Sequence, residues 1–124
     1  MSRRSALKAM LGASCLVLLA PFARAHAGLE KSEPARRATL SKAPKKIRLW
    51  FNERLEPDYA SVKLYGEDGE KLIETPKAVV DAMDPKLLEM ELPPLPPGQY
   101  TVKYRVLSVD GHTVDYGYVF TIKP

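Results

Sequence analysis

The stretch Gln99-Tyr100-Thr101-Val102-Lys103-Tyr104-Arg105-Val106-Leu107-Ser108-Val109 alternates apolar and polar side chains along most of its length. Successive side chains of a β-strand point to opposite faces, so its even-numbered residues would line one buried face. Residues 114–122 repeat the pattern, with Val114, Tyr116, Tyr118, Phe120 and Ile122 on one side. The two stretches predict a pair of long, half-buried strands joined by a short connection.

Shorter alternating segments precede this pair, at residues 46–51, 61–65, 71–74 and 88–92. Asp68-Gly69 is a strong turn signal and predicts a hairpin between the second and third of them. Prolines fall in the connections, and the run at residues 93–98 predicts a stiff loop, because proline cannot donate to a sheet ladder. No segment has a convincing helical pattern. About seven short strands with turns between them predict a single all-β domain of the β-sandwich type.

The first 25 residues have the features of an export signal. Arg3, Arg4 and Lys8 precede a mostly apolar run, and Ala23-Arg24-Ala25 has small residues where a signal peptidase would cut. We therefore expect residues 1–25 to be a cleaved signal peptide and residues 26–124 to be the mature domain. The apolar run is shorter than the ~20 residues of a membrane span, which argues against a retained anchor. Both the general secretory and the twin-arginine export routes stay open.

The excess positive charge also lies in this leader. The full chain of 124 residues has a formal net charge of +4, but residues 26–124 hold 15 basic and 15 acidic residues. Nucleic-acid binding is therefore not a leading hypothesis. The one cysteine, Cys15, would be removed with the leader, and Gly12 does not fit a lipoprotein acylation site there. A mature domain without cysteine has no disulfide, thiolate metal site or cysteine nucleophile.

The chain has two histidines, and each has a plain and a functional interpretation. His26 would be the first mature residue, by chance or because its α-amino group and its imidazole Nδ1 together chelate a metal ion. His112 lies in Asp110-Gly111-His112, which is either a solvated turn or a pair of metal ligands projecting to one side. Taken together, His26 with its amine, Asp110 and His112 form a set of three nitrogens and one oxygen. Such a set favours Cu(II), with Ni(II) and Zn(II) as competitors.

The mature chain resembles the CopC/PcoC family of periplasmic copper-binding proteins over essentially all of residues 26–124. The matching pieces are His26-Ala27 directly after the leader, residues 29–35, Pro44 with residues 47–53, residues 92–102, and residues 104–112 followed by Gly117. The string Tyr104-Arg105-Val106-Leu107-Ser108-Val109-Asp110-Gly111-His112 is the most distinctive of them. The resemblance implies a seven-stranded Greek-key, immunoglobulin-like sandwich. It also implies Cu(II) ligation by His26, Asp110 and His112.

Two departures from the family pattern concern copper. Position 28 is Gly, where some members have a second N-terminal histidine, and the mature chain has only Met83 and Met90 where others have a methionine-rich Cu(I) loop. Met90 alternates with core residues, so Met83 would stand alone. We therefore expect a protein that binds Cu(II) only.

Four residues near the motif each have two interpretations. Arg105 and Ser108 either hydrogen-bond the Asp110 carboxylate or lie on a solvated strand face. For Tyr116 and Tyr118, core packing is favoured over a place beside the metal.

The sequence thus predicts a non-catalytic, monomeric periplasmic protein of copper homeostasis or resistance. By resemblance alone, its partner would be an inner-membrane copper transporter related to the CopD family. Two other classes stay open. One is an oxidative enzyme with a copper brace. Such an enzyme needs open coordination positions on copper, and Asp110 would fill one of them. The other is a metal-free immunoglobulin-like interaction module.

Overall fold

The computed structural model describes residues 28–124, so the expected leader and His26 lie outside the described residues. The described chain is almost entirely β-structure. Its strands are β1 (Leu29–Glu33), β2 (Thr39–Leu40), β3 (Lys46–Phe51), β4 (Ser61–Gly66), β5 (Lys71–Ile73), β6 (Val79–Val80), β7 (Leu87–Glu91), β8 (Gly98–Leu107) and β9 (Thr113–Ile122). One short 3₁₀ helix, Pro57–Tyr59, precedes β4. No helix in residues 28–124 is long and apolar enough to cross a membrane.

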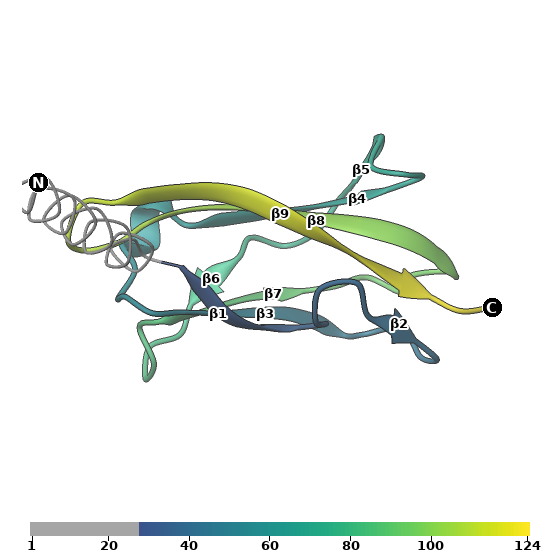
Figure 1. Ribbon diagram of the computed structural model, residues 1–124, viewed down its shortest axis with the longest axis horizontal. Helices are drawn as coiled ribbons and strands as arrows, with labels where there is room; N and C mark the ends of the chain where they lie inside the picture. Colours follow the sequence, from purple (N-terminus) through teal and green to yellow (C-terminus); the bar gives the residue numbers. More distant parts are fainter. Residues whose placement is uncertain (1–27) are drawn as a thin grey trace, which may run out of the picture.

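The strands form two sheets that face each other (Figure 1). One has four strands in the order β1-β3-β7-β6, and the other has five in the order β2-β9-β8-β4-β5. The chain passes from one sheet to the other at five connections, β1–β2, β2–β3, β3–β4, β5–β6 and β7–β8. This is the connectivity of a Greek-key, immunoglobulin-like sandwich, as the sequence predicted.

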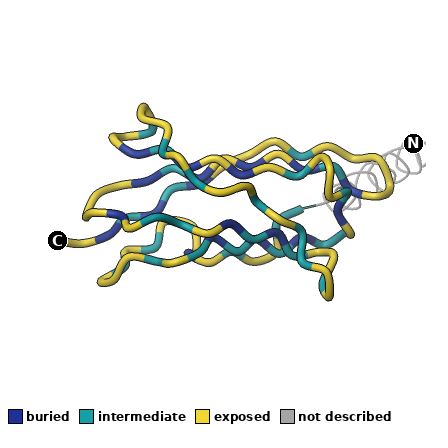
Figure 2. The backbone as a smooth tube through the Cα atoms, turned by 180° about the vertical axis from the view of Figure 1, so that it is seen from behind, coloured by how far each residue is buried: buried dark blue, intermediate teal, exposed yellow. Residues whose placement is uncertain are grey.

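The alternation in the sequence becomes the core between the sheets (Figure 2). Ile47, Leu49 and Phe51 of β3 point inward against the even-numbered residues of β8, and each is at most 1% exposed. Met90 lies in this core, as predicted. Tyr118 is also buried, but Tyr116 is 63% exposed, so the prediction of core packing for Tyr116 is wrong. Tyr116 keeps the alternation of β9, but it lies in the part of the strand next to the β8–β9 turn, where residues 113–117 are exposed or half-buried.

The described residues contain nine strands rather than about seven. β2 and β6 have two residues each, too few for alternation to appear in the sequence. β1 also went unpredicted, because it is an edge strand with an irregular register between Leu29 and Lys31, which interrupts the period of two.

Candidate metal centre

Residues 108–112 form the turn between β8 and β9, at one end of the sandwich (Figure 1). The pairing of the two strands extends to Leu107 and Thr113. The turn is then closed by Ser108 N–H donating to His112 O at 2.9 Å and Gly111 N–H donating to Ser108 O at 2.9 Å. Gly111 has a φ of +96°, a left-handed conformation that favours glycine. The turn is therefore fixed by its own backbone and carries Asp110 and His112.

Ser108 organises the polar side of this turn. It is 1% exposed, although its neighbours in the turn are exposed. Its hydroxyl donates to Asp110 Oδ1, and the backbone N–H of His112 donates to the same hydroxyl at 3.2 Å. One buried side chain thus ties together both candidate ligands. The expectation that Ser108 bonds the carboxylate is confirmed.

Asp110 and His112 are in direct contact. His112 Nδ1 lies 3.1 Å from Asp110 Oδ1, and both side chains are about half exposed. The hydrogen bond from Ser108 is the main cause that holds the pKa of Asp110 below its usual range; partial desolvation opposes it, and His112 adds to it. The carboxylate therefore stays ionised under mildly acidic conditions, as a ligand for a cation must.

Arg105 does not take part in this network. Its Nη1 pairs with Asp115 Oδ2 at 2.9 Å on the exposed side of β8 and β9. The hypothesis that Arg105 bonds the Asp110 carboxylate is wrong, because odd-numbered residues of β8 point away from the core while Ser108 is buried. The alternative, a solvated strand face, holds for Arg105.

Residues 52–55 connect the turn to the start of the described chain. Val109 N–H donates to Arg54 O at 2.9 Å, and Leu55 forms a β-bridge with Ser108. Three residues earlier, the side-chain oxygen of Asn52 accepts from Gly28 N–H at 2.7 Å, and Asn52 N–H donates to Gly28 O at 3.0 Å. Gly28 is thereby held at the same end of the sandwich as Asp110 and His112.

The described residues therefore bring together two of the three predicted ligands, and His26 lies outside them. Within residues 28–124, no group of three or more His, Cys, Asp or Glu side chains gathers into a possible metal site. Met83 is 92% exposed in the loop before β7, while Met90 Sδ accepts from the Thr75 hydroxyl at 3.2 Å in the core. These two methionines do not form a common site, as the sequence indicated.

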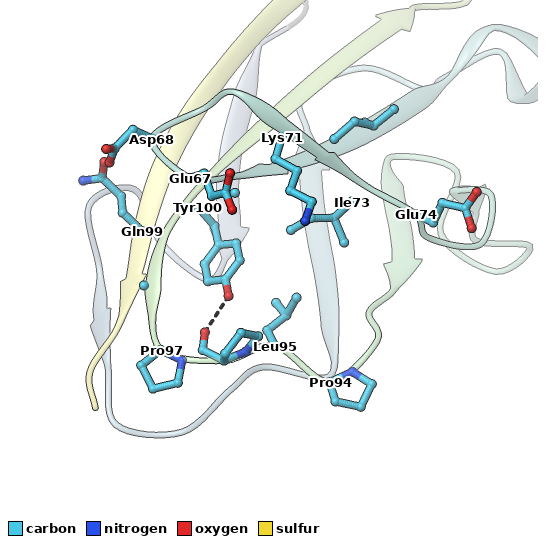
Figure 3. A pocket seen from close by; sticks show the side chains of 14 residues that line it. Glu67, Asp68, Lys71, Ile73, Glu74, Pro94, Leu95, Pro97, Gln99 and Tyr100 are labelled. Carbon is cyan, nitrogen blue, oxygen red and sulfur yellow. Dashed lines mark hydrogen bonds between the residues drawn. The ribbon is translucent and has the colours of Figure 1, made fainter.

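A hollow of about 610 Å³ lies at the opposite end of the sandwich (Figure 3). The β4–β5 hairpin overhangs the proline-rich loop there, and the Tyr100 hydroxyl donates to Pro96 O. Lys71, Ile73 and Leu95 line this hollow with the carboxylates of Glu67 and Glu74 (Figure 3), but no possible metal-binding group gathers there within the described residues. The size of this hollow does not make it the functional site, because the candidate ligands lie at the other end of β8.

Asn52 has no separate role that the sequence alone indicates. The only feature that could have pointed to this residue is its position directly after the alternating residues 46–51. Its contact with Gly28 depends on the pairing of β1 with β3. That pairing was not predictable without β1.

A family model described as the CopC domain matches residues 29–123. The chain belongs to the CopC family. Protein YobA of Escherichia coli strain K12 is 38% identical to this CopC-family chain over 107 residues, with 86% of each chain covered. Copper resistance protein C of Pseudomonas syringae pv. tomato is 32% identical over 112 residues, with 86% of this chain and 88% of that one covered.

Solved structures agree with this assignment. CopC from Methylosinus trichosporium OB3b has a TM-score of 0.74 at 36% identity and covers 80% of this chain and 95% of its own. PcoC, a methionine-rich copper resistance protein from Escherichia coli, has a TM-score of 0.67 at 34% identity, with 80% of this chain and 100% of its own covered. A copper-related role is therefore a property of the family to which the chain belongs.

Proposed function

We propose that this CopC-family chain is an exported protein that holds Cu(II) and serves copper homeostasis or resistance, without catalysis. The ligands would be the α-amino group and imidazole of His26, the carboxylate of Asp110 and the imidazole of His112. The observation that carries the proposal is the contact between Asp110 and His112 in a turn fixed by Ser108. Family membership supports the choice of copper.

The position of Gly28 supports the proposal that His26 is a copper ligand. Consecutive Cα atoms are about 3.8 Å apart, so residue 26 lies within about 7.6 Å of the Gly28 Cα. Asn52 holds Gly28 next to the segment that also contacts Val109. A ligand two residues before Gly28 can therefore reach the end of the sandwich that carries Asp110 and His112.

The chemistry of the donors favours the same ion. Three nitrogens and one carboxylate oxygen, without sulfur, suit Cu(II) at tetragonal geometry. The contact between the carboxylate and the imidazole, 3.1 Å between Asp110 Oδ1 and His112 Nδ1, holds the two side chains close enough to bind one ion. Bound copper would be released by acid, because the amine and both imidazoles bind only when unprotonated.

Residues 1–25 would be removed during export to the periplasm, leaving residues 26–124 as a monomeric domain. Removal of the leader converts the nitrogen of His26 from an amide into an amine, which a metal can deprotonate near neutral pH because the pKa of an α-amino group is about 7.7–8.0. A CopD-like protein of the inner membrane would be the transport partner.

The test is a Cu(II) titration of the protein as the cell exports it, followed by electron paramagnetic resonance. We expect one tight site with a nitrogen-rich spectrum, and its loss in Asp110→Ala and His112→Ala. Asp58→Ala, an exposed carboxylate on the 3₁₀ helix, is the matched control and should bind copper normally. Normal binding by His112→Ala would refute the proposal, and substrate-dependent turnover with ascorbate and peroxide would refute the absence of catalysis.

A further inference from the structure

The outer face of the five-stranded sheet carries a group of exposed cations beside apolar side chains. Lys63 of β4 and Lys103 and Arg105 of β8 point outward, because the intervening residues of both strands are buried in the core. Tyr65 lies next along β4, and Leu72 of β5 is its direct cross-strand partner. We call Lys63, Lys103, Arg105, Tyr65 and Leu72 together the cationic face.

The two lysines of this face are direct cross-strand partners. Side chains opposite each other on antiparallel strands have Cβ atoms about 4.5–5.5 Å apart, and like charges at this spacing destabilise the sheet. Both lysines are exposed and neither contributes to the core. Their pairing therefore does not serve the stability of the fold.

The positive charge is only partly balanced within the described chain. Arg105 pairs with Asp115 at 2.9 Å, and Lys103 Nζ lies 5.4 Å from the centre of the Tyr65 ring. Across residues 28–124, neither Lys63 nor Lys103 has a carboxylate within salt-bridge distance of 4.0 Å. The three cations line a hollow of about 220 Å³ together with Ser61, Tyr65, Tyr104 and Asp115. The face thus offers two unbalanced cations, one arginine and an aromatic ring around one depression.

We propose that the cationic face docks an acidic segment of a partner protein that also carries apolar side chains. Carboxylates would bind Lys63 and Lys103 and compete with Asp115 for Arg105, whose planar guanidinium suits a carboxylate. Leu72 is 55% exposed and would give an apolar side chain of the partner a surface to cover, next to Tyr65. Charge complementarity of this kind mainly guides association and orientation.

A protein segment suits this face better than an anionic membrane. Sequence clusters that bind anionic lipids have about four to eight basic residues. The cationic face has three, and the carboxylate of Asp115 lies among them. Few, discretely placed charges around a small hollow match a short acidic peptide.

A partner docked on the cationic face would lie where it could exchange copper with the candidate metal centre. This part of the inference rests on the proposed function. β8 and β9 run side by side from the cationic face to the turn that carries Asp110 and His112 (Figure 1). Arg105 is five residues from Asp110, a separation of at most roughly 17 Å along an extended chain. A partner on the cationic face would therefore lie beside the candidate metal centre.

The test measures binding of a fluorescent peptide of eight alternating Glu and Leu residues to the exported protein by fluorescence anisotropy. The triple variant Lys63→Gln/Lys103→Gln/Arg105→Gln should lose about tenfold in affinity, and salt at about 0.1 M should weaken the wild-type complex. The control Lys42→Gln/Lys45→Gln/Lys123→Gln removes the same charge from exposed positions outside the cationic face and should bind like the wild type. A peptide with Gln in place of Glu should not bind.

The proposal would be overturned if the acidic peptide does not bind, or if both triple variants lose the same affinity for it. It would also be overturned if Lys63→Gln lowers the melting temperature. Finally, it would be overturned if vesicles containing phosphatidylglycerol bind as well as the peptide and depend on the same cations. The triple variant should also titrate Cu(II) like the wild type. If peptide binding fails while copper binding persists, the docking surface is refuted alone. If copper binding fails while peptide binding persists, only the proposed function is refuted.

Discussion

Asn52 holds Gly28 through two hydrogen bonds, one from Gly28 N–H to its side-chain oxygen at 2.7 Å and one from its own N–H to Gly28 O at 3.0 Å. Asn52 begins the segment that contacts the β8–β9 turn through Arg54 and Leu55. The first described residue and the turn with Asp110 and His112 are therefore attached to the same short loop. This connection joins two parts of the chain that are about eighty residues apart in sequence.

Asn52→Ala should weaken copper binding without unfolding the domain. The substitution removes the acceptor for Gly28 N–H, and a hydrogen bond of this kind contributes about 1 kcal/mol. We expect Cu(II) affinity to fall by about five- to tenfold in a competition titration. Asn52→Asp keeps an acceptor oxygen and should retain more of the affinity. Equal affinity in the wild type and a folded Asn52→Ala protein would contradict the role assigned to this residue.

Ser108→Ala should raise the pKa of Asp110. The pKa of this carboxyl is low mainly because the Ser108 hydroxyl donates to it, so loss of the hydroxyl moves the pKa back toward its ordinary value. Titration of the Asp110 carboxyl carbon by NMR measures the change directly. The exposed Ser41→Ala is the control and should leave the pKa unchanged. A fall in the pKa, or no change, would show that another group sets it.

Alkaline pH should destabilise the fold through Tyr118. Burial raises the pKa of Tyr118 to about 12, and the nearby Ser32 hydroxyl, which does not reach hydrogen-bonding geometry, acts in the opposite direction. The pKa of Tyr118 in the folded state lies above the unfolded value of 10.0. The contribution of this group to the free energy of unfolding is therefore complete below pH 10 and is lost as the pH rises toward 12. Chemical denaturation across this range should show the loss of about 2–3 kcal/mol from this group.

Tyr118→Phe provides the matched variant for that experiment. No group in the described chain hydrogen-bonds the Tyr118 hydroxyl, although the residue is only 7% exposed. Removal of an unpartnered buried hydroxyl should leave stability at neutral pH equal or higher and should reduce the alkaline loss. Marked destabilisation by Tyr118→Phe at neutral pH would mean that the hydroxyl has a partner.

Gly117→Ala should destabilise the domain more than Gly111→Ala. A Cβ at position 117 would lie 2.6 Å from the backbone oxygen of Val102 on the paired strand β8, so the β8–β9 pair would have to separate. We expect a loss of about 2–3 kcal/mol of unfolding free energy. At Gly111 there is no atom within 4 Å of the added Cβ, and the cost comes only from its positive φ, about 1 kcal/mol. Thermal denaturation of the two variants compares them, and the reverse order would contradict this explanation.

The long strands and the turn between them were predictable because alternation over β8 and β9 is sustained and Asp110-Gly111 interrupts it. The strands β1 and β2 were not, since their partners are distant in sequence, and β6 was not, since it has only two residues. The same limit applies to the site. Asp110 and His112 are close in sequence and were identified together, whereas the contact of Asn52 with Gly28 depends on the β1–β3 pairing. The sequence left open whether Arg105 bonds the Asp110 carboxylate, and its partner Asp115 required the register of β8 with β9.

The central claim is that the amine of His26 binds copper together with Asp110 and His112. The most direct measurement is a Cu(II) competition titration of two exported proteins, one beginning at His26 as verified by mass spectrometry and one with a single Gly placed before it. The account predicts that the Gly extension lowers the affinity by at least about a hundredfold, because the amine becomes an amide and the chelate ring is lost. The same affinity in both proteins, or a natural N-terminus at another residue, would contradict it.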